Sequence, residues 1–270
     1  MQINPTNLLK TLATGTIATL FLVLAPGCMD ITGRGPAPLA RTLDPQADLA
    51  HPRIGEVYCM RGWLGIFSTG MDALAAKVDK EVPSVSVADE EWRRLKGFII
   101  NENKAGRLNK PLILVGHSWG ADDSIRIAEA LKTEGITVDL LITIDPVTPP
   151  DVPDNVLRVY NIYKSHPGTD ALPFWRGVPI DPKTTKCPLT NIDLRTAKVG
   201  FETESIDHIN IEKSDGVHEM VMEQVRQVCE MRDSQTATAP ATAPATEPAS
   251  QVRAAATPPV PNLSASAHTP

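Results

Sequence analysis

The sequence predicts an α/β fold, in which a mostly parallel sheet carries helices on both faces and has no large cap domain. Two observations predict it. Strand-like apolar runs alternate with stretches of helical spacing between residues 51 and 232, and such alternation implies a parallel sheet built with right-handed crossovers. The run PLILV at 111–115 is apolar without interruption, which is typical of a strand buried on both faces.

The expected elements follow one another in regular order. Strands are expected at 54–60, 82–87, 111–115, 138–144 and 156–163. A first helix is expected behind Ser68, a candidate N-cap, because Met71, Leu74, Ala75 and Val78 recur at helical spacing. Further helices are expected at 89–103, from Gly120 to about Leu131, and at about 215–231.

The N-terminal segment has the composition of an export signal. Residues 11–25 form one apolar run behind Lys10, with small residues after it. A spanning helix needs about 20 apolar residues, so the run predicts a signal peptide over 1–27. Residues 28–50 are interrupted by Pro and Gly, and we expect them to form a tether.

The C-terminal segment is of low complexity. Residues 233–270 consist mainly of Ala, Thr, Pro and Ser. Such a segment buries too little apolar surface to offset its ordering entropy, so we expect a disordered tail. One folded domain therefore remains, at 51–232.

Cys28 follows Ala25-Pro26-Gly27, and this small-residue ending resembles the bacterial lipobox. The resemblance implies that Cys28 is acylated and becomes the N-terminus of an exported lipoprotein, facing the periplasm or at the cell surface. Acyl chains on one cysteine hold a protein at a membrane without a spanning segment. The alternative is a secreted protein with a cleaved signal and an ordinary cysteine at position 28.

Charge and cysteine spacing exclude several classes of partner. The formal net charge is −6, and an acidic chain does not attract phosphate backbones, which argues against nucleic acid. Cys59, Cys187 and Cys229 form no CxxC or Cys/His pattern, so no metal site is expected. Cys187 and Cys229 are a candidate disulfide pair, with Cys59 left inside a strand.

The segment Gly116-His117-Ser118-Trp119-Gly120 carries the chemistry. It has the form G-x-S-x-G and lies directly between the buried strand PLILV and a helical stretch, which is the context of a nucleophile elbow. Such a tight turn has no room for side chains at its flanks and raises the serine hydroxyl over a helix N-terminus. Ser118 is therefore the candidate nucleophile.

The segment LILVGHSWGA resembles the α/β-hydrolase superfamily, and the resemblance covers about residues 54–231. It implies an oxyanion hole, for which Arg61-Gly62-Trp63-Leu64-Gly65 resembles the family's His-Gly-x-x-Gly turn, with Arg61 in place of the His. By this analogy the backbone N–H groups of Trp63 and Trp119 face the oxyanion.

The resemblance also implies an acid and a base after the nucleophile in chain order. Asp145 closes the strand ending at 144 and resembles the Asp-Pro acid of animal triglyceride lipases. Most members place the acid one strand later, which would point to Asp170. His208 precedes the last helix, where the superfamily keeps its catalytic histidine, whereas His218 lies within that helical pattern.

These residues predict acyl transfer without a cofactor. His208 takes the Ser118 proton, Ser118 attacks a carbonyl carbon, and Asp145 holds the imidazole. The expected substrate is a small or extended carboxylic ester or thioester. The Pro-rich segment 166–200 is either a small lid, with Leu172-Pro173-Phe174-Trp175 exposed, or a packed surface loop.

Two other functions stay open. An acyltransferase would use the same acyl-enzyme with an acceptor other than water. A non-catalytic envelope lipoprotein would keep the hydrolase fold as a binding module, but it would have no need of Ser118, Asp145 and His208 together. Fold analogy does not separate these functions.

Overall fold

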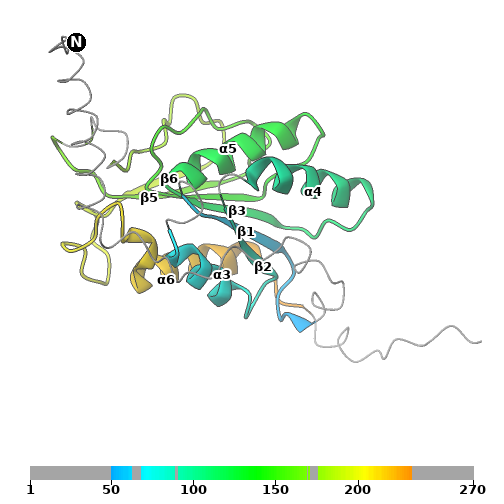
Figure 1. The fold of residues 1–270 in the computed structure, drawn as a ribbon, viewed down its shortest axis with the longest axis horizontal. Coiled ribbons are helices and arrows are strands. Elements are labelled where there is room, and N and C mark those ends of the chain that lie inside the picture. The colour runs from blue at the N-terminus through cyan, green and yellow to red at the C-terminus, as the bar shows by residue number, and fades with distance from the viewer. Residues whose placement is uncertain (1–49, 63–67, 89–90, 169, 171–175, 233–270) are drawn as a thin grey trace, which may run out of the picture. The chain divides into compact units, whose positions relative to one another are not determined.

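The computed structural model describes residues 50–62, 68–88, 91–168, 170 and 176–232. They form a six-stranded sheet in the order β2-β1-β3-β4-β5-β6 (Figure 1). The strands are β1 (Glu56–Met60), β2 (Ser84–Val87), β3 (Leu112–His117), β4 (Leu140–Ile144), β5 (Val159–Tyr163) and β6 (Leu189–Asp193). Every neighbouring pair is parallel, which confirms the predicted α/β class.

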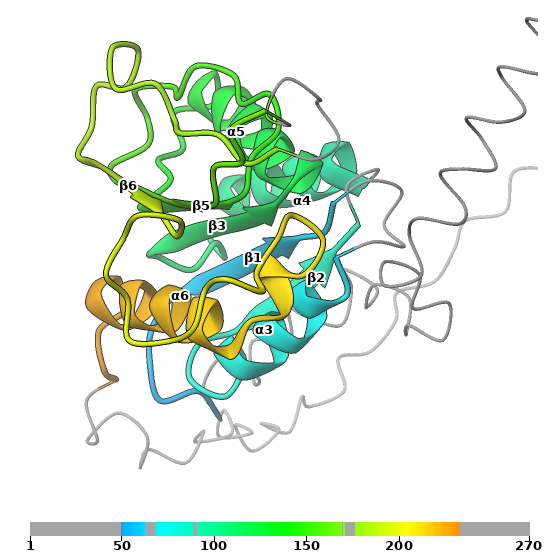
Figure 2. The ribbon, with the colours of Figure 1, turned by 90° about the vertical axis from the view of Figure 1, so that its left-hand side faces the viewer.

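Helices cover both faces of the sheet, as Figure 2 shows with α3 and α6 on one side and α4 and α5 on the other. The helices are α3 (Gly70–Val78), α4 (Trp92–Lys104), α5 (Trp119–Lys132), the short 3₁₀ helix η4 (Ile211–Lys213) and α6 (Asp215–Val228). Alternate residues of each strand face opposite layers, so Val57 packs with α3 and α6 while Tyr58 packs with α4 and α5. Two apolar layers explain why β3 and β4 are buried along their whole length.

The register brings the carboxyl ends of the central strands to one level. Met60 of β1 lies beside Gly116 of β3, and His117 lies beside Ile144 of β4, which in turn lies beside Ile162 of β5. The residues that directly follow β3, β4 and β5 therefore meet at one edge of the sheet. That edge is where open α/β sheets bind their ligands.

The sixth strand corrects the prediction for 166–200. Part of that segment, β6, pairs in parallel with β5 and extends the sheet. β6 is an edge strand whose residues are mostly half-buried, so its sequence LTNID lacks the apolar run that marks a buried strand. The side chains named as a lid, 172–175, lie outside the described residues.

The N-cap prediction for the first helix was wrong. Thr69 is the N-cap of α3 and makes no capping hydrogen bond with its side chain. Ser68 instead has a φ of 66°, and its hydroxyl bonds elsewhere, as described below. The other predicted elements are present with ends displaced by a few residues; β5, for example, begins at Val159 because Val156 makes only an isolated bridge, to Val138.

The three cysteines described by the structure are free thiols. Cys229 belongs to the apolar layer under α3 and α6, whereas Cys187 packs against the opposite layer. Because the sheet separates them, the candidate pair Cys187–Cys229 is not formed. Cys59 lies inside β1, as expected, and is fully buried.

The predictions for the chain ends concern residues 1–50 and 233–270, and of these only Ala50 lies in the described part of the chain. The signal, the tether, the acylated Cys28 and the disordered tail therefore stay predictions. Within the described part, no helix is both long and apolar enough to cross a membrane.

Candidate active site

Ser118 stands at the turn between β3 and α5, with a φ of 57° that few L residues adopt. A Cβ on Gly116 would lie 2.3 Å from the carbonyl oxygen of Gly120, and a Cβ on Gly120 would lie 2.1 Å from the carbonyl oxygen of Arg61. Only glycine fits at either position. Gly116 is thus required by the sharpness of the turn that sets Ser118 at the carboxyl edge of the sheet, and Gly120 by the close approach of the backbone that follows β1.

The structure brings Ser118, His208 and Asp145 into one hydrogen-bonded chain. Ser118 Oγ lies 2.9 Å from His208 Nε2, and His208 Nδ1 lies 3.0 Å from Asp145 Oδ2. All three side chains are buried, so they interact in surroundings where charge interactions are strong. The hydrogen bonds run from the hydroxyl to the imidazole and from the imidazole to the carboxylate, which is the arrangement of a serine–histidine–aspartate triad.

Asp145 directly follows β4 and has a φ of 49°. Its Oδ1 accepts the backbone N–H of Lys164 at 2.8 Å, while Oδ2 faces the imidazole. A carboxylate only accepts, so Nδ1 of His208 carries the proton and Nε2 is left as the acceptor for the Ser118 hydroxyl. A Cβ on Gly177 would lie 1.8 Å from Asp145 Oδ1, so the backbone at Gly177 closes over the carboxylate.

The competing candidates lie elsewhere. The Asp170 carboxylate accepts the backbone N–H of His166, at 2.9 Å to each oxygen. His218 is buried on α6, where Nε2 donates to the Glu212 carbonyl at 2.6 Å and Nδ1 lies 2.9 Å from Lys77 Nζ. Neither residue is hydrogen-bonded to Ser118 or His208.

The candidate oxyanion donors are described only in part. Trp119 is the first residue of α5 and follows Ser118 directly, so its N–H lies at the positive end of the helix dipole. Trp63 lies outside the described residues. Gly62, just before it, lies close to Ser118, since a Cβ on Gly62 would lie 3.0 Å from Ser118 Cβ.

Arg61 pairs with an acidic side chain of the neighbouring helix. Its buried guanidinium forms a two-pronged ion pair with Asp72 of α3, in which Nε donates at 2.8 Å. A bidentate pair of this kind fixes both side chains. Arg61 therefore ties the turn after β1 to α3.

His117 links the two sides of the site. Its Nε2 donates to the backbone carbonyl of His208 at 3.0 Å, so Nδ1 is left to accept from the Ser68 hydroxyl at 2.6 Å. Ser68 Oγ in turn accepts the N–H of Gly62 at 3.0 Å. Burial, followed by the neighbouring His208, lowers the pKa of His117 well below its ordinary range, which keeps the ring neutral for this relay.

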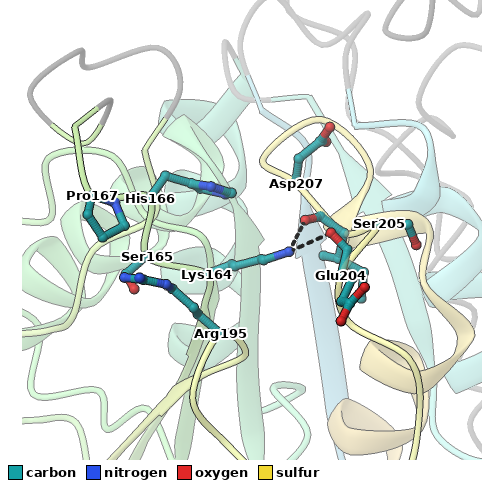
Figure 3. A pocket seen from close by; sticks show the side chains of 9 residues that line it. Lys164, Ser165, His166, Pro167, Arg195, Glu204, Ser205 and Asp207 are labelled. Carbon is teal, nitrogen blue, oxygen red and sulfur yellow. Dashed lines mark hydrogen bonds between the residues drawn. The ribbon is translucent and has the colours of Figure 1, made fainter.

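A cavity of about 540 Å³ lies beside the segment that leads to His208. Its lining includes Lys164, Arg195 and Asp207 but neither Ser118 nor His208. Figure 3 shows the Lys164 ammonium reaching across to the backbone of the facing segment. Nothing in the sequence singles out Lys164, because its contacts are made to residues about 40 positions further along the chain.

Glu212 of η4 is a fully buried carboxyl group close to the site. Burial raises its pKa from 4.5 to about 7, against the opposing positive charge of Lys213. The folded chain therefore binds this proton more tightly than the unfolded chain, and the contribution of Glu212 to stability falls as pH rises from 4.5 to 7.

We expect Glu212→Gln to become more stable relative to wild type across the same pH interval. The relative gain should be on the order of 3 kcal/mol, because the pKa of Glu212 rises from 4.5 to about 7 and each pKa unit corresponds to about 1.36 kcal/mol. Urea unfolding of both proteins at pH 4.5 and pH 7.5 measures it. A stability difference that does not change with pH would contradict the raised pKa.

The chain matches no protein-family model and no curated protein. Among solved structures it is similar to the NocB thioesterase domain from the nocardicin cluster, at 13% identity and a TM-score of 0.41 over 63% of this chain and 93% of that one. It is also similar to the type II thioesterase BorB from the borrelidin biosynthetic cluster, at 15% identity and a TM-score of 0.41 over 67% and 95% of the two chains.

The architecture itself is that of an α/β-hydrolase-like fold. It has a parallel sheet with helices on both faces and a strand–turn–helix elbow after β3. No large cap domain is present among the described residues. The predicted fold class is thus confirmed.

Proposed function

We propose that the protein is a serine hydrolase that cleaves a carboxylic ester or thioester through an acyl-enzyme on Ser118. The observation that carries the proposal is the chain of hydrogen bonds from Ser118 through His208 to Asp145. Its members come from three different segments and meet at the carboxyl edge of the sheet. A binding module on this fold would not require a nucleophile, a base and an acid in this order.

The proposed reaction has two steps. His208 Nε2 takes the hydroxyl proton as Ser118 Oγ attacks the carbonyl carbon, and the imidazolium then gives that proton to the leaving alkoxide or thiolate. In the second step His208 takes a proton from water, which attacks the acyl-enzyme carbonyl. The imidazolium then returns the proton to Ser118 Oγ, and the carboxylic acid product is released. Asp145 stabilises the imidazolium formed in each step and keeps the proton on Nδ1.

The oxyanion formed in each step requires donors. We assign this role to the backbone N–H groups of Trp119 and Trp63, of which Trp119 opens α5. Such donors are effective because they are aimed before charge develops, and the loss of one typically slows the reaction by about 10²–10³-fold.

A fluorophosphonate probe tests the proposal without knowledge of the substrate. The probe phosphonylates a serine only when a base has activated its hydroxyl, so wild type should be labelled and Ser118→Ala should not. Mass spectrometry of the labelled peptide checks the site. Equal labelling of the two proteins, or none of wild type, would remove the basis of the proposal.

We further propose that the enzyme is held at the bacterial cell envelope through acylated Cys28. The support is the signal-like run at 11–25 followed by small residues and a cysteine. Cys28→Ala should then move the protein from the membrane fraction to the soluble fraction and abolish labelling with a fatty-acid analogue. Wild-type protein that takes up no label would contradict the anchor and favour a secreted form.

A further inference from the structure

Lys164 follows β5 and its side chain is buried, with 8% of the residue exposed. Its Nζ donates three hydrogen bonds, to the backbone carbonyls of Thr203 at 2.6 Å, Glu204 at 3.0 Å and Ile206 at 2.6 Å. An ammonium group has three N–H donors, so all of them are engaged by one short segment. Figure 3 shows the side chain extended between the two sides of the cavity.

The same residue contacts the acid of the triad through its backbone. The Lys164 N–H donates to Asp145 Oδ1 at 2.8 Å, on the carboxylate whose other oxygen holds His208. The three carbonyls bound by the ammonium belong to the segment that leads directly to His208. One residue thus holds Asp145 with its main chain and the segment bearing the base with its side chain.

Burying an ammonium group only to fill space is unfavourable in free energy. Removing it from water is unfavourable unless hydrogen bonds compensate, and an apolar side chain would fill the same space without that cost. What an apolar side chain would not do is fix three carbonyl groups in position. The charged group is therefore best explained by the geometry it imposes on residues 203–206.

We propose that Lys164 is a positioning residue, which sets the distance and angle between His208 and Asp145 by clamping the backbone that precedes the base. This proposal rests on the proposed function of the Ser118–His208–Asp145 chain. A displacement of a catalytic group by about 1 Å can slow turnover by about 10²-fold. A small movement of the segment that precedes His208 is therefore sufficient to cause a large loss of rate.

Lys164→Met tests the clamp, because it keeps the length of the side chain and removes the three hydrogen bonds. We expect kcat to fall by about 10²-fold with little change in KM. A weaker bond between His208 and Asp145 also stabilises the imidazolium less, so the acidic limb of the kcat/KM profile should move to lower pH. Lys164→Arg, which restores charge and donors beside a cavity able to take its larger head group, should recover most of the lost rate.

Lys110→Met is the control for the loss of a lysine with three bonds. Lys110 Nζ bonds the carbonyl and hydroxyl of Thr137 and pairs with Asp139, but the residue is exposed and precedes β3, so it lies at the opposite edge of the sheet. Its loss should lower the melting temperature without changing kcat or the pH profile. The contrast separates loss of positioning from loss of stability.

Two further readouts keep the proposals separable. The downfield proton resonance of His208 Nδ1–H reports the bond to Asp145 and should shift or broaden in Lys164→Met but not in Lys110→Met, with or without turnover.

If wild type reacts with fluorophosphonate and Lys164→Met matches it in labelling rate, pH profile and resonance, the clamp is overturned. If wild type never reacts, the proposed function fails, and the resonance alone decides the role of Lys164. Should Lys164→Met not fold, Lys164→Gln, with two N–H donors, takes its place and should show the same changes at smaller size.

Discussion

Ser118→Ala and His208→Ala should each abolish nearly all turnover of an activated short-chain ester. The serine hydroxyl is a poor nucleophile unless the imidazole removes its proton, so deleting either group costs nearly as much as deleting both. The expected loss in kcat is on the order of 10⁶-fold. Initial rates at saturating ester, with folding checked by circular dichroism, measure it.

His218→Ala is the matched control for the base. His218 is also buried and hydrogen-bonded, but to the Glu212 carbonyl and Lys77 rather than to Ser118. Its loss should lower stability and leave the rate of the folded enzyme nearly unchanged. The choice of base would be wrong if His218→Ala were as inactive as Ser118→Ala while His208→Ala kept its activity.

Local sequence signals were sufficient for the centre of the fold. The run 112–115 of β3 is apolar because both faces are covered. The two glycines of G-x-S-x-G follow because a Cβ on Gly116 would meet the backbone of Gly120, and a Cβ on Gly120 would meet that of Arg61. Periodicity and turn chemistry of this kind are visible within a window of about 11–18 residues. His208 was singled out by chain order relative to the last helix, and the structure places it beside Ser118.

Features that depend on distant contacts left no such signal. Ser68 reads locally as an N-cap, but its partner is His117, 49 positions away. The carbonyls that bind Lys164 are about 40 positions away, and backbone carbonyls are the same in every residue type. β6 was missed for a related reason: an edge strand is recognised by the neighbour it pairs with, and LTNID carries little apolar pattern of its own.

Asp145→Asn should reduce kcat by about 10⁴-fold, because the amide leads to the wrong imidazole tautomer. The backbone N–H of Lys164 requires an acceptor at the Oδ1 position, so the amide oxygen of Asn has to stay there. Its NH₂ group then faces Nδ1 of His208, which must accept, and the imidazole proton moves to Nε2. The Ser118 hydroxyl is left facing an N–H instead of a base.

This substitution is a clean test because little else changes. Asparagine tolerates the φ of 49° at this position as well as aspartate does, and it keeps the side-chain volume under Gly177. Asp170→Asn is the control, since that carboxylate accepts only the backbone N–H of His166 among its described side-chain bonds, and it should retain activity. An Asp145→Asn enzyme with near wild-type kcat, beside an inactive Asp170→Asn enzyme, would transfer the role of acid to Asp170.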